Sequence, residues 1–286
     1  MSDISSRVRT SFVFGAGAIS RTFLPLIQKE YKVVGFLDND KTLWGKVIEG
    51  IVVYPPQEIM NADYDMVFVN STTSYQAIIE QLLEMGVERG KTNADFVTVP
   101  VKSRILFLEK LGLLFQDDQI GGCVAEGGVF QGEFAKEINR VFSNKTLFLF
   151  DTFSGFDVRD TEIEQKKQYS EATAGRYNIT SEALVMSKMP HPERCVIRKG
   201  YFPETTEGIN ETFCFVNLDF DLFLPVLSGL EYFVPRMEKK GVILIHDYFS
   251  EGYKGGKEAV KEYCKKAQKE LHMFPIGDGI SIGIKC

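Results

Sequence analysis

The sequence predicts an α/β protein with two domains, each built around a mostly parallel sheet. Apolar strand-like runs alternate with helix-like stretches, which is the order expected of parallel strands covered by helices. The alternation stops over residues 100–118 and then starts again. The chain has 286 residues, and domains usually contain about 100–200 residues, so two domains also fit the length.

The first hundred residues predict a small sheet. Short apolar runs that fit strands lie at residues 8–14, 32–37, 51–53, 65–70 and 95–99. Residues 74–85 place apolar side chains at helical spacing. We therefore expect a first domain over 1–100 and a linker over 101–119 with a helix around 103–114.

The remaining residues, 120–286, predict five strand–helix units and a closing hairpin. The predicted strands begin near residue 123 and continue at 146–151, 195–200, 213–219 and 241–247. Helices are expected to about residue 142, over 225–238 and over 255–270, and the polar stretch 157–193 predicts a helical insertion that could cover the acceptor. The turn Gly277-Asp278-Gly279 between two apolar runs predicts an antiparallel pair at the end.

Composition excludes several classes of protein. The net charge of −6 disfavours nucleic-acid binding, which needs clustered Lys and Arg. The five cysteines are scattered and form no Cys-x-x-Cys pair, which argues against disulfides or structural zinc and favours a reducing cytoplasm. No apolar run approaches the ~20 residues of a membrane span, so we expect a cytoplasmic protein. A homo-oligomer is left open.

A glycine-rich motif follows the first strand of the second domain. It runs from Glu126 through Gly128 to Gly132 and reads E-x-G-x-x-x-G. Glycines at such a junction let the backbone approach a ligand, and the start of the helix offers free N–H groups. The acid suits a cationic ligand such as the amino group of S-adenosylmethionine. The same spacing also fits a structural tight turn.

Polar or glycine residues end each of the next four predicted strands. They are Asp151, the run Lys199-Gly200-Tyr201, Asp219, and the pair His246-Asp247. In open α/β sheets ligands bind at the carboxyl ends of the strands, where an acid after the second strand can accept ribose hydroxyls. Any one of these residues could simply cap its strand, but the whole set predicts a binding site.

Several blocks in this region resemble the macrocin O-methyltransferase (TylF-type) family. They are GGCVAEGGVFQGEFA, LFLFDTFSGFD, RKGYFPET, LDFDLFLPVLSGLEYFVPRM and GVILIHDYFSEGYKGGKEAVKEY. The resemblance implies a Rossmann-like, seven-stranded class I methyltransferase sheet, S-adenosylmethionine as cofactor, Mg²⁺ in several members, and methylation of sugar hydroxyls. It implies cofactor binding by Glu126, Gly128, Gly132 and Asp151, flanked by Phe153, Gly200 and Tyr201.

The predicted catalytic residues are Asp219, His246 and Asp247. Related Mg²⁺-dependent O-methyltransferases place acidic ligands there, and Mg²⁺ prefers oxygen ligands. His246 departs from that pattern and would suit a softer divalent ion. It could instead be the general base for the acceptor hydroxyl, or a structural histidine. Asp221 would ligate a metal or only orient Asp219.

The first domain contains a second glycine motif. Gly15 and Gly17 follow a strand and precede a helix, and Asp38 ends the next strand, which is close to the dinucleotide fingerprint with Ser20 in place of its third glycine. This Rossmann-like domain also resembles the nucleotide-sugar-binding domain of bacterial sugar acyltransferases and polysaccharide-biosynthesis proteins. A nucleotide or nucleotide-sugar, NAD, or no ligand at all remain alternatives.

Three functions fit these patterns. The first is an S-adenosylmethionine-dependent O-methyltransferase acting on a sugar, a nucleotide-sugar or a glycosylated metabolite. The second is an NAD-dependent oxidoreductase or epimerase of nucleotide-sugars, although residues 1–100 lack the Tyr-x-x-x-Lys pair such enzymes use. The third is a non-catalytic nucleotide-sugar-binding protein. The acids at the strand ends favour the methyltransferase.

Overall fold

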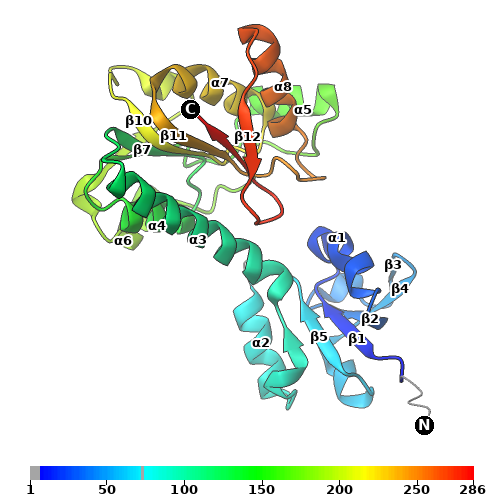
Figure 1. Ribbon diagram of the computed structural model, residues 1–286. Helices are drawn as coiled ribbons and strands as arrows, with labels where there is room; N and C mark the ends of the chain where they lie inside the picture. Colours follow the sequence, from blue (N-terminus) through cyan, green and yellow to red (C-terminus); the bar gives the residue numbers. More distant parts are fainter. Residues whose placement is uncertain (1–6, 72–73) are drawn as a thin grey trace, which may run out of the picture. The chain divides into compact units, whose positions relative to one another are not determined.

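The computed structural model describes residues 7–71 and 74–286 and divides the chain into two compact units, Met1–Val101 and Lys102–Cys286 (Figure 1). Helix α3 (Asp95–Asp117) crosses this boundary and supplies residues to both units. Each unit has its own sheet and its own apolar core. None of the helices in the described ranges has the length and apolar character to cross a membrane.

The first unit contains a six-stranded sheet in the order β3-β4-β2-β1-β5-β6. The pairs are parallel except β3–β4, which is antiparallel. Its strands are β1 (Thr10–Phe14), β2 (Lys32–Leu37), β3 (Val47–Ile48), β4 (Ile51–Tyr54), β5 (Met66–Val69) and β6 (Thr92–Asn93), and its helices are α1 (Ala18–Ile27) and α2 (Tyr75–Glu84). Phe12 and Phe14 of β1 lie in one core cluster and Val13 in another, because successive strand residues face opposite sides.

Two expected elements differ near the unit boundary. The strand predicted at 95–99 is wrong, because β6 covers only Thr92–Asn93 and α3 begins at Asp95. A short apolar run does not by its periodicity distinguish a strand from a buried helical turn. Pro100 lies inside the helix, although a proline there predicts an interruption. The predicted linker helix around 103–114 is therefore one part of a longer helix.

The second unit contains the predicted seven-stranded sheet, in the order β12-β13-β11-β10-β7-β8-β9. Five strands are parallel, and β13 runs antiparallel to both its neighbours, which confirms the closing hairpin. The strands are β7 (Cys123–Gly127), β8 (Leu147–Asp151), β9 (Cys195–Lys199), β10 (Phe213–Leu218), β11 (Met237–Ile245), β12 (His272–Pro275) and β13 (Ile282–Lys285).

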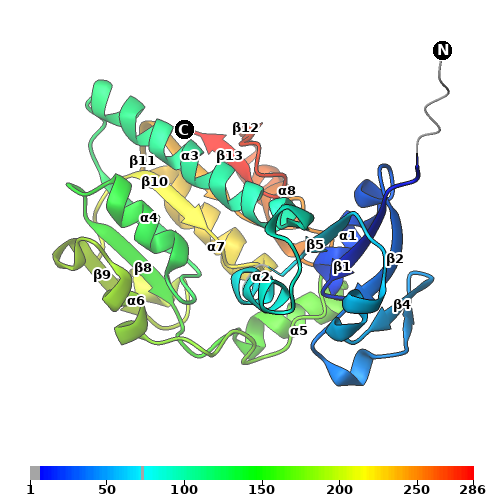
Figure 2. The same ribbon diagram turned by 90° about the horizontal axis from the view of Figure 1, so that it is seen from below.

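Helices cover both faces of this sheet. In Figures 1 and 2, α3 and α4 lie on one face and α5, α7 and α8 on the other. The helices are α4 (Glu133–Val141), α5 (Val158–Lys167), α6 (Glu182–Lys188), α7 (Phe223–Phe233) and α8 (Gly255–Ala267). The helix predicted over 225–238 is shorter, since β11 already begins at Met237. Every residue of β10 is buried, as expected of a central parallel strand.

Six short 3-10 helices complete the described elements. They are η1 (Lys41–Leu43), η2 (Pro56–Asn61), η3 (Arg89–Lys91), η4 (Pro192–Arg194), η5 (Glu204–Thr206) and η6 (Val234–Arg236). The predicted insertion 157–193 contains α5, α6 and the irregular stretch between them. This arrangement brings the carboxyl ends of all five parallel strands of the second unit to one edge of its sheet.

Candidate active site

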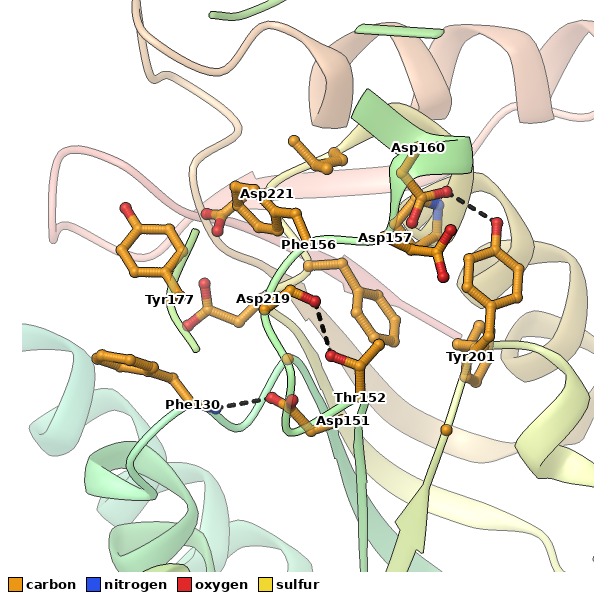
Figure 3. Close-up of a pocket in the computed structure, with 17 residues that line it drawn as sticks. Phe130, Asp151, Thr152, Phe156, Asp157, Asp160, Tyr177, Tyr201, Asp219 and Asp221 are labelled. Atoms are coloured by element: carbon orange, nitrogen blue, oxygen red, sulfur yellow. Dashed lines mark hydrogen bonds between the residues drawn. The ribbon is translucent and has the colours of Figure 1, made fainter. Parts of the chain in front are cut away.

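A cavity with an empty volume of about 640 Å³ opens at the carboxyl edge of the second sheet. Figure 3 shows Asp151 at the base of the cavity, with Asp219 and Tyr177 on one side of it and Asp160 and Tyr201 on the other. Four of the five strand ends singled out by the sequence therefore line one cavity, and the fifth, His246-Asp247, lies beside it against Asp219.

The glycine loop after β7 is wedged between the ends of β8 and β10. The Gly128 N–H donates to the Phe150 carbonyl at 2.9 Å, and the Asp219 N–H donates to the Gly127 carbonyl at 2.7 Å. Gly128 has a φ of +83°, and a Cβ there would lie 2.1 Å from the Asp219 carbonyl oxygen. Only glycine fits, because both the backbone angle and the close approach exclude a side chain.

Asp151 holds this loop in place. Its Oδ2 accepts hydrogen bonds from the Val129 and Phe130 N–H groups, both at 2.8 Å, and its Oδ1 accepts from the Phe153 N–H at 2.7 Å. Burial raises the pKa of Asp151, and the three N–H bonds oppose that rise. Asp151 also lines the cavity, and its oxygens keep lone pairs that can accept from a ligand.

Gly132 and Phe153, two of the predicted cofactor residues, pack into the protein. A Cβ on Gly132 would lie 3.1 Å from Val185 of α6, and Phe153 is buried in the same apolar cluster as Val129. Gly200 and Tyr201 do line the cavity. The Gly200 N–H donates to the Asp151 carbonyl at 2.9 Å and so ties the two neighbouring loops together.

Glu126 is a buried acid with one unpaired oxygen. Its side chain is 1% exposed, and Oε1 accepts a hydrogen bond from Asn217 Nδ2 at 2.8 Å. Oε2 is buried and has no partner. Burial and the nearby charge of Asp219 raise the pKa of Glu126 to about 8. The protein therefore keeps a proton on Glu126 until a cation replaces it.

Asp219, His246 and Asp247 converge on one point. His246 Nδ1 lies 2.9 Å from Asp219 Oδ1 and 3.0 Å from Asp247 Oδ2. Ligand atoms bonded at about 2.1 Å to one ion, at right angles, lie about 3 Å apart. One nitrogen and two carboxylate oxygens can thus hold a divalent cation, and their spacing fits that role.

The charges around His246 set its protonation. Burial lowers the pKa of His246, but Asp219 and Asp247 outweigh burial and raise it to about 10. His246 in turn lowers the pKa of Asp247 to about 2, against the effect of burial. These two carboxylates favour the protonated imidazole at neutral pH. A bound cation would take the place of that proton.

Asp221 lies beside this group. Burial and the neighbouring Asp247 raise the pKa of Asp221 well above its ordinary value. Asp221 and Asp247 both adopt left-handed backbone angles, with φ of 62° and 55°. Such angles are uncommon for non-glycine residues and cluster at functional sites. Asp221 lines the cavity and is positioned to orient Asp247.

Arg104 reaches the site from α3 and was not predicted from the sequence. Its Nη1 lies 3.6 Å from Asp219 Oδ2, and its side chain is 13% exposed. The guanidinium carbon lies 4.3 Å from the centre of the Phe134 ring in α4. No local motif marks a single arginine in a helix as a site residue, because only the fold brings it to Asp219.

The sequence also missed Asp160 at the far end of the cavity. Tyr201 Oη donates to Asp160 Oδ1 at 2.8 Å, and Arg159 stacks on the Tyr201 ring with its guanidinium carbon 3.5 Å from the ring centre. Burial raises the pKa of Asp160 to about 6. Asp160 comes from α5, so the insertion after β8 contributes directly to the cavity wall.

Aromatic rings form the wall beside Asp219. Tyr177, from the same insertion, meets Phe130 and Phe156 edge-on with ring centres 5.4 and 5.2 Å apart. Its hydroxyl lies 3.4 Å from that of Tyr253. The insertion is held there by a pair of backbone bonds, from Phe156 N–H to the Arg176 carbonyl and from Gly175 N–H to the Phe156 carbonyl.

The predicted nucleotide loop of the first unit has a comparable architecture. Gly15 has a φ of +97°, and the Ala16 N–H donates to Asp38 Oδ2 at 2.9 Å. Gly17 begins α1 with an ordinary φ of −78°, and a Cβ there would meet nothing within 4 Å. Neither backbone strain nor packing therefore requires glycine at position 17.

Comparison with solved structures defines the class of the fold. The O-methyltransferase NovP matches with a TM-score of 0.52 and 16% identity, covering 75% of this chain and 99% of NovP. The calicheamicin methyltransferase CalS11 matches with a TM-score of 0.54 and 17% identity, covering 76% of this chain and 95% of CalS11. The chain thus shares the fold of O-methyltransferases. No curated protein sequence matches it significantly.

Family models assign the two halves separately. Residues 96–277 match the model of macrocin-O-methyltransferase (TylF), and residues 9–92 match the model described as C2185-like, N-terminal. The first match spans more than half of the chain, so the chain belongs to the macrocin-O-methyltransferase (TylF) family and is a methyltransferase. The family resemblance predicted from the sequence is confirmed.

The pKa of Glu126 predicts a pH-dependent stability. A carboxyl with an ordinary pKa of 4.5 when unfolded and about 8 when folded binds its proton more tightly in the folded state. The cofactor-free protein should therefore lose stability as pH rises from about 4.5 to 8, by roughly 2–5 kcal/mol, because each pKa unit is worth about 1.4 kcal/mol. Urea unfolding across this range measures the effect.

Glu126→Gln removes the titrating group and should flatten this part of the profile. Exposed Glu207, in the loop before β10, gives a control, since Glu207→Gln should leave the profile unchanged. Identical slopes for the wild type and Glu126→Gln would show that Glu126 is ionised in the folded protein.

Proposed function

We propose that the chain transfers a methyl group from S-adenosylmethionine to a hydroxyl of a sugar, a nucleotide-sugar or a glycosylated metabolite. One observation carries the proposal. The cavity joins an acidic, glycine-lined centre to an end where Asp219 lies beside aromatic rings (Figure 3). The centre suits a cationic nucleoside, and aromatic faces beside a group that can activate a hydroxyl suit a sugar.

The cavity suggests how the cofactor lies. Glu126, with its unpaired Oε2, would accept the ammonium group of the methionine part. Asp151 would accept ribose hydroxyls in the middle of the cavity, as acids after the second strand do in dinucleotide folds. Asp160 and Tyr201 would then lie at the adenine end. The sulfonium methyl would face Asp219 at the opposite end.

The chemistry requires the acceptor hydroxyl to lose its proton. A sugar hydroxyl is a poor nucleophile, whereas the sulfonium methyl is already activated. The protein therefore chiefly has to position the two groups and help the hydroxyl lose its proton. Asp219, His246 and Asp247 would hold a divalent cation, which lowers the pKa of a bound hydroxyl when present. Asp221 would orient Asp247, and the aromatic wall of Phe130, Phe156 and Tyr177 would exclude water and stack on the sugar ring.

For the first unit we propose nucleotide or nucleotide-sugar binding at Gly15, Gly17 and Asp38. Two buried side chains near the loop support it: Ser20 Oγ lies 3.8 Å from the position of a Gly15 Cβ, and Asn70 follows β5. Both are less than 5% exposed, and their polar atoms have no partner. Buried polar groups are nearly always paired, and exceptions point to a missing ligand.

Chelation should reduce methyl transfer much more than cofactor binding. Asp219 lines the acceptor end of the cavity and His246 and Asp247 lie beside it, whereas Glu126 and Asp151 would bind the cofactor. We expect EDTA to lower the rate by at least about tenfold while the Kd of S-adenosylhomocysteine, measured by calorimetry, stays within about threefold. Asp247→Asn should behave like the chelated enzyme, and added Mg²⁺ or Mn²⁺ should restore only the wild type. Full activity in EDTA would rule out the metal.

Gly17→Leu should abolish nucleotide binding by the first unit without unfolding it. The substituted side chain has room in the cofactor-free protein but would fill the space above the loop where a phosphate would approach. Thermal shifts of the full chain with UDP, dTDP, their sugars and NAD measure the effect. Gly90→Leu, also at an open position, is the matched control. The proposal fails if no nucleotide shifts the wild type.

A further inference from the structure

Two buried ionisable side chains beside the glycine loop each have an atom without a hydrogen-bond partner. Glu126 Oε2 and Arg104 Nη1 are both inaccessible, and neither makes a hydrogen bond. A buried polar atom without a hydrogen bond is costly, so such atoms are rare, and each one calls for a partner or a functional role. The two atoms have opposite charge preferences, one for a cation and one for an anion.

Arg104 is held firmly but not satisfied. Its guanidinium carbon lies over the Phe134 ring, 4.3 Å from the ring centre, which holds it against the first turn of α4, immediately after the glycine loop. Its distance of 3.6 Å to Asp219 Oδ2 exceeds hydrogen-bonding range. A guanidinium that served only to neutralise Asp219 would be expected to form the closer, bidentate contact that arginine and carboxylate prefer.

The cofactor supplies a group that matches each atom. The methionine end of S-adenosylmethionine bears an ammonium and a carboxylate on the same carbon. If Glu126 takes the ammonium, the carboxylate must lie near Asp151, Asp219 and Glu126 itself, all of which repel it. Arg104 is a buried guanidinium in that neighbourhood, close enough for its charge to act on Glu126 as well as on Asp219.

We infer that Arg104 binds the carboxylate of the cofactor's methionine end, as the counterpart of Glu126 at the ammonium. This inference rests on the proposed function. It places a cofactor-binding residue on α3, outside the strand ends where the sequence motifs lie. It also gives the buried guanidinium the hydrogen bonds that it lacks in the cofactor-free protein.

The test compares three ligands, of which the first two differ only in the carboxylate. S-adenosylhomocysteine carries it, its decarboxylated form lacks it, and 5′-methylthioadenosine lacks the whole amino-acid end. Arg104→Ala and Arg104→Gln should weaken S-adenosylhomocysteine binding by roughly 10–100-fold, the range for a lost charge-assisted hydrogen bond. They should change the Kd of the decarboxylated form by less than about threefold. Calorimetry with the full chain gives all the constants.

The controls separate this inference from folding and from the proposed function. Unchanged binding of 5′-methylthioadenosine shows that the variant is folded, and Lys102→Ala, exposed on the same helix, should leave all three affinities unchanged. Equal losses for S-adenosylhomocysteine and its decarboxylated form, or no loss for either, would overturn the role of Arg104. Failure of the wild type to bind S-adenosylhomocysteine would instead overturn the proposed function.

Discussion

Mutual repulsion among carboxyl groups is the constraint on which this site depends. Five of them meet at one edge of the second sheet: Glu126, Asp151, Asp219, Asp221 and Asp247. The glycine loop makes the crowding unavoidable, because Gly128 brings β7 against the backbone of Asp219. Like charges at such distances persist only with protons, cations or hydrogen-bond donors between them.

The five carboxyl groups are compensated in three ways, and each form of compensation suggests a role. Backbone N–H groups stabilise Asp151, which leaves it able to accept further bonds. Burial raises the pKa of Glu126 and of Asp221, which favours their protonated forms, whereas Asp219 and Asp247 both contact the imidazole of His246. A cationic cofactor can replace the proton of Glu126, and a divalent ion can replace that of His246. The protonated and ion-paired groups of this site are thus the positions at which the proposed cations would bind.

The sequence could predict whatever follows from local order along the chain. The alternation of strands and helices predicted the two sheets. The polar residues after the strands identified Asp151, Asp219 and Asp247 as neighbours, because parallel strands end at the same edge of a sheet. The prediction of a strand at 95–99 was wrong because the apolar run before Pro100 is too short for its spacing to distinguish a strand from a helix. Arg104 and Asp160 could not be predicted, since each reaches the cavity from a helix whose placement depends on tertiary packing.

The central claim is methyl transfer from S-adenosylmethionine to a sugar hydroxyl, and a single labelling experiment tests it. The purified chain, S-adenosylmethionine with an isotopically labelled methyl group, and Mg²⁺ or Mn²⁺ are incubated with a panel of nucleotide-sugars and glycosides. A matched panel of catechols, amines and thiols is run alongside, and products are located by mass spectrometry and NMR. The account predicts a labelled O-methyl group on a sugar carbon. Label found only on non-sugar acceptors would contradict it.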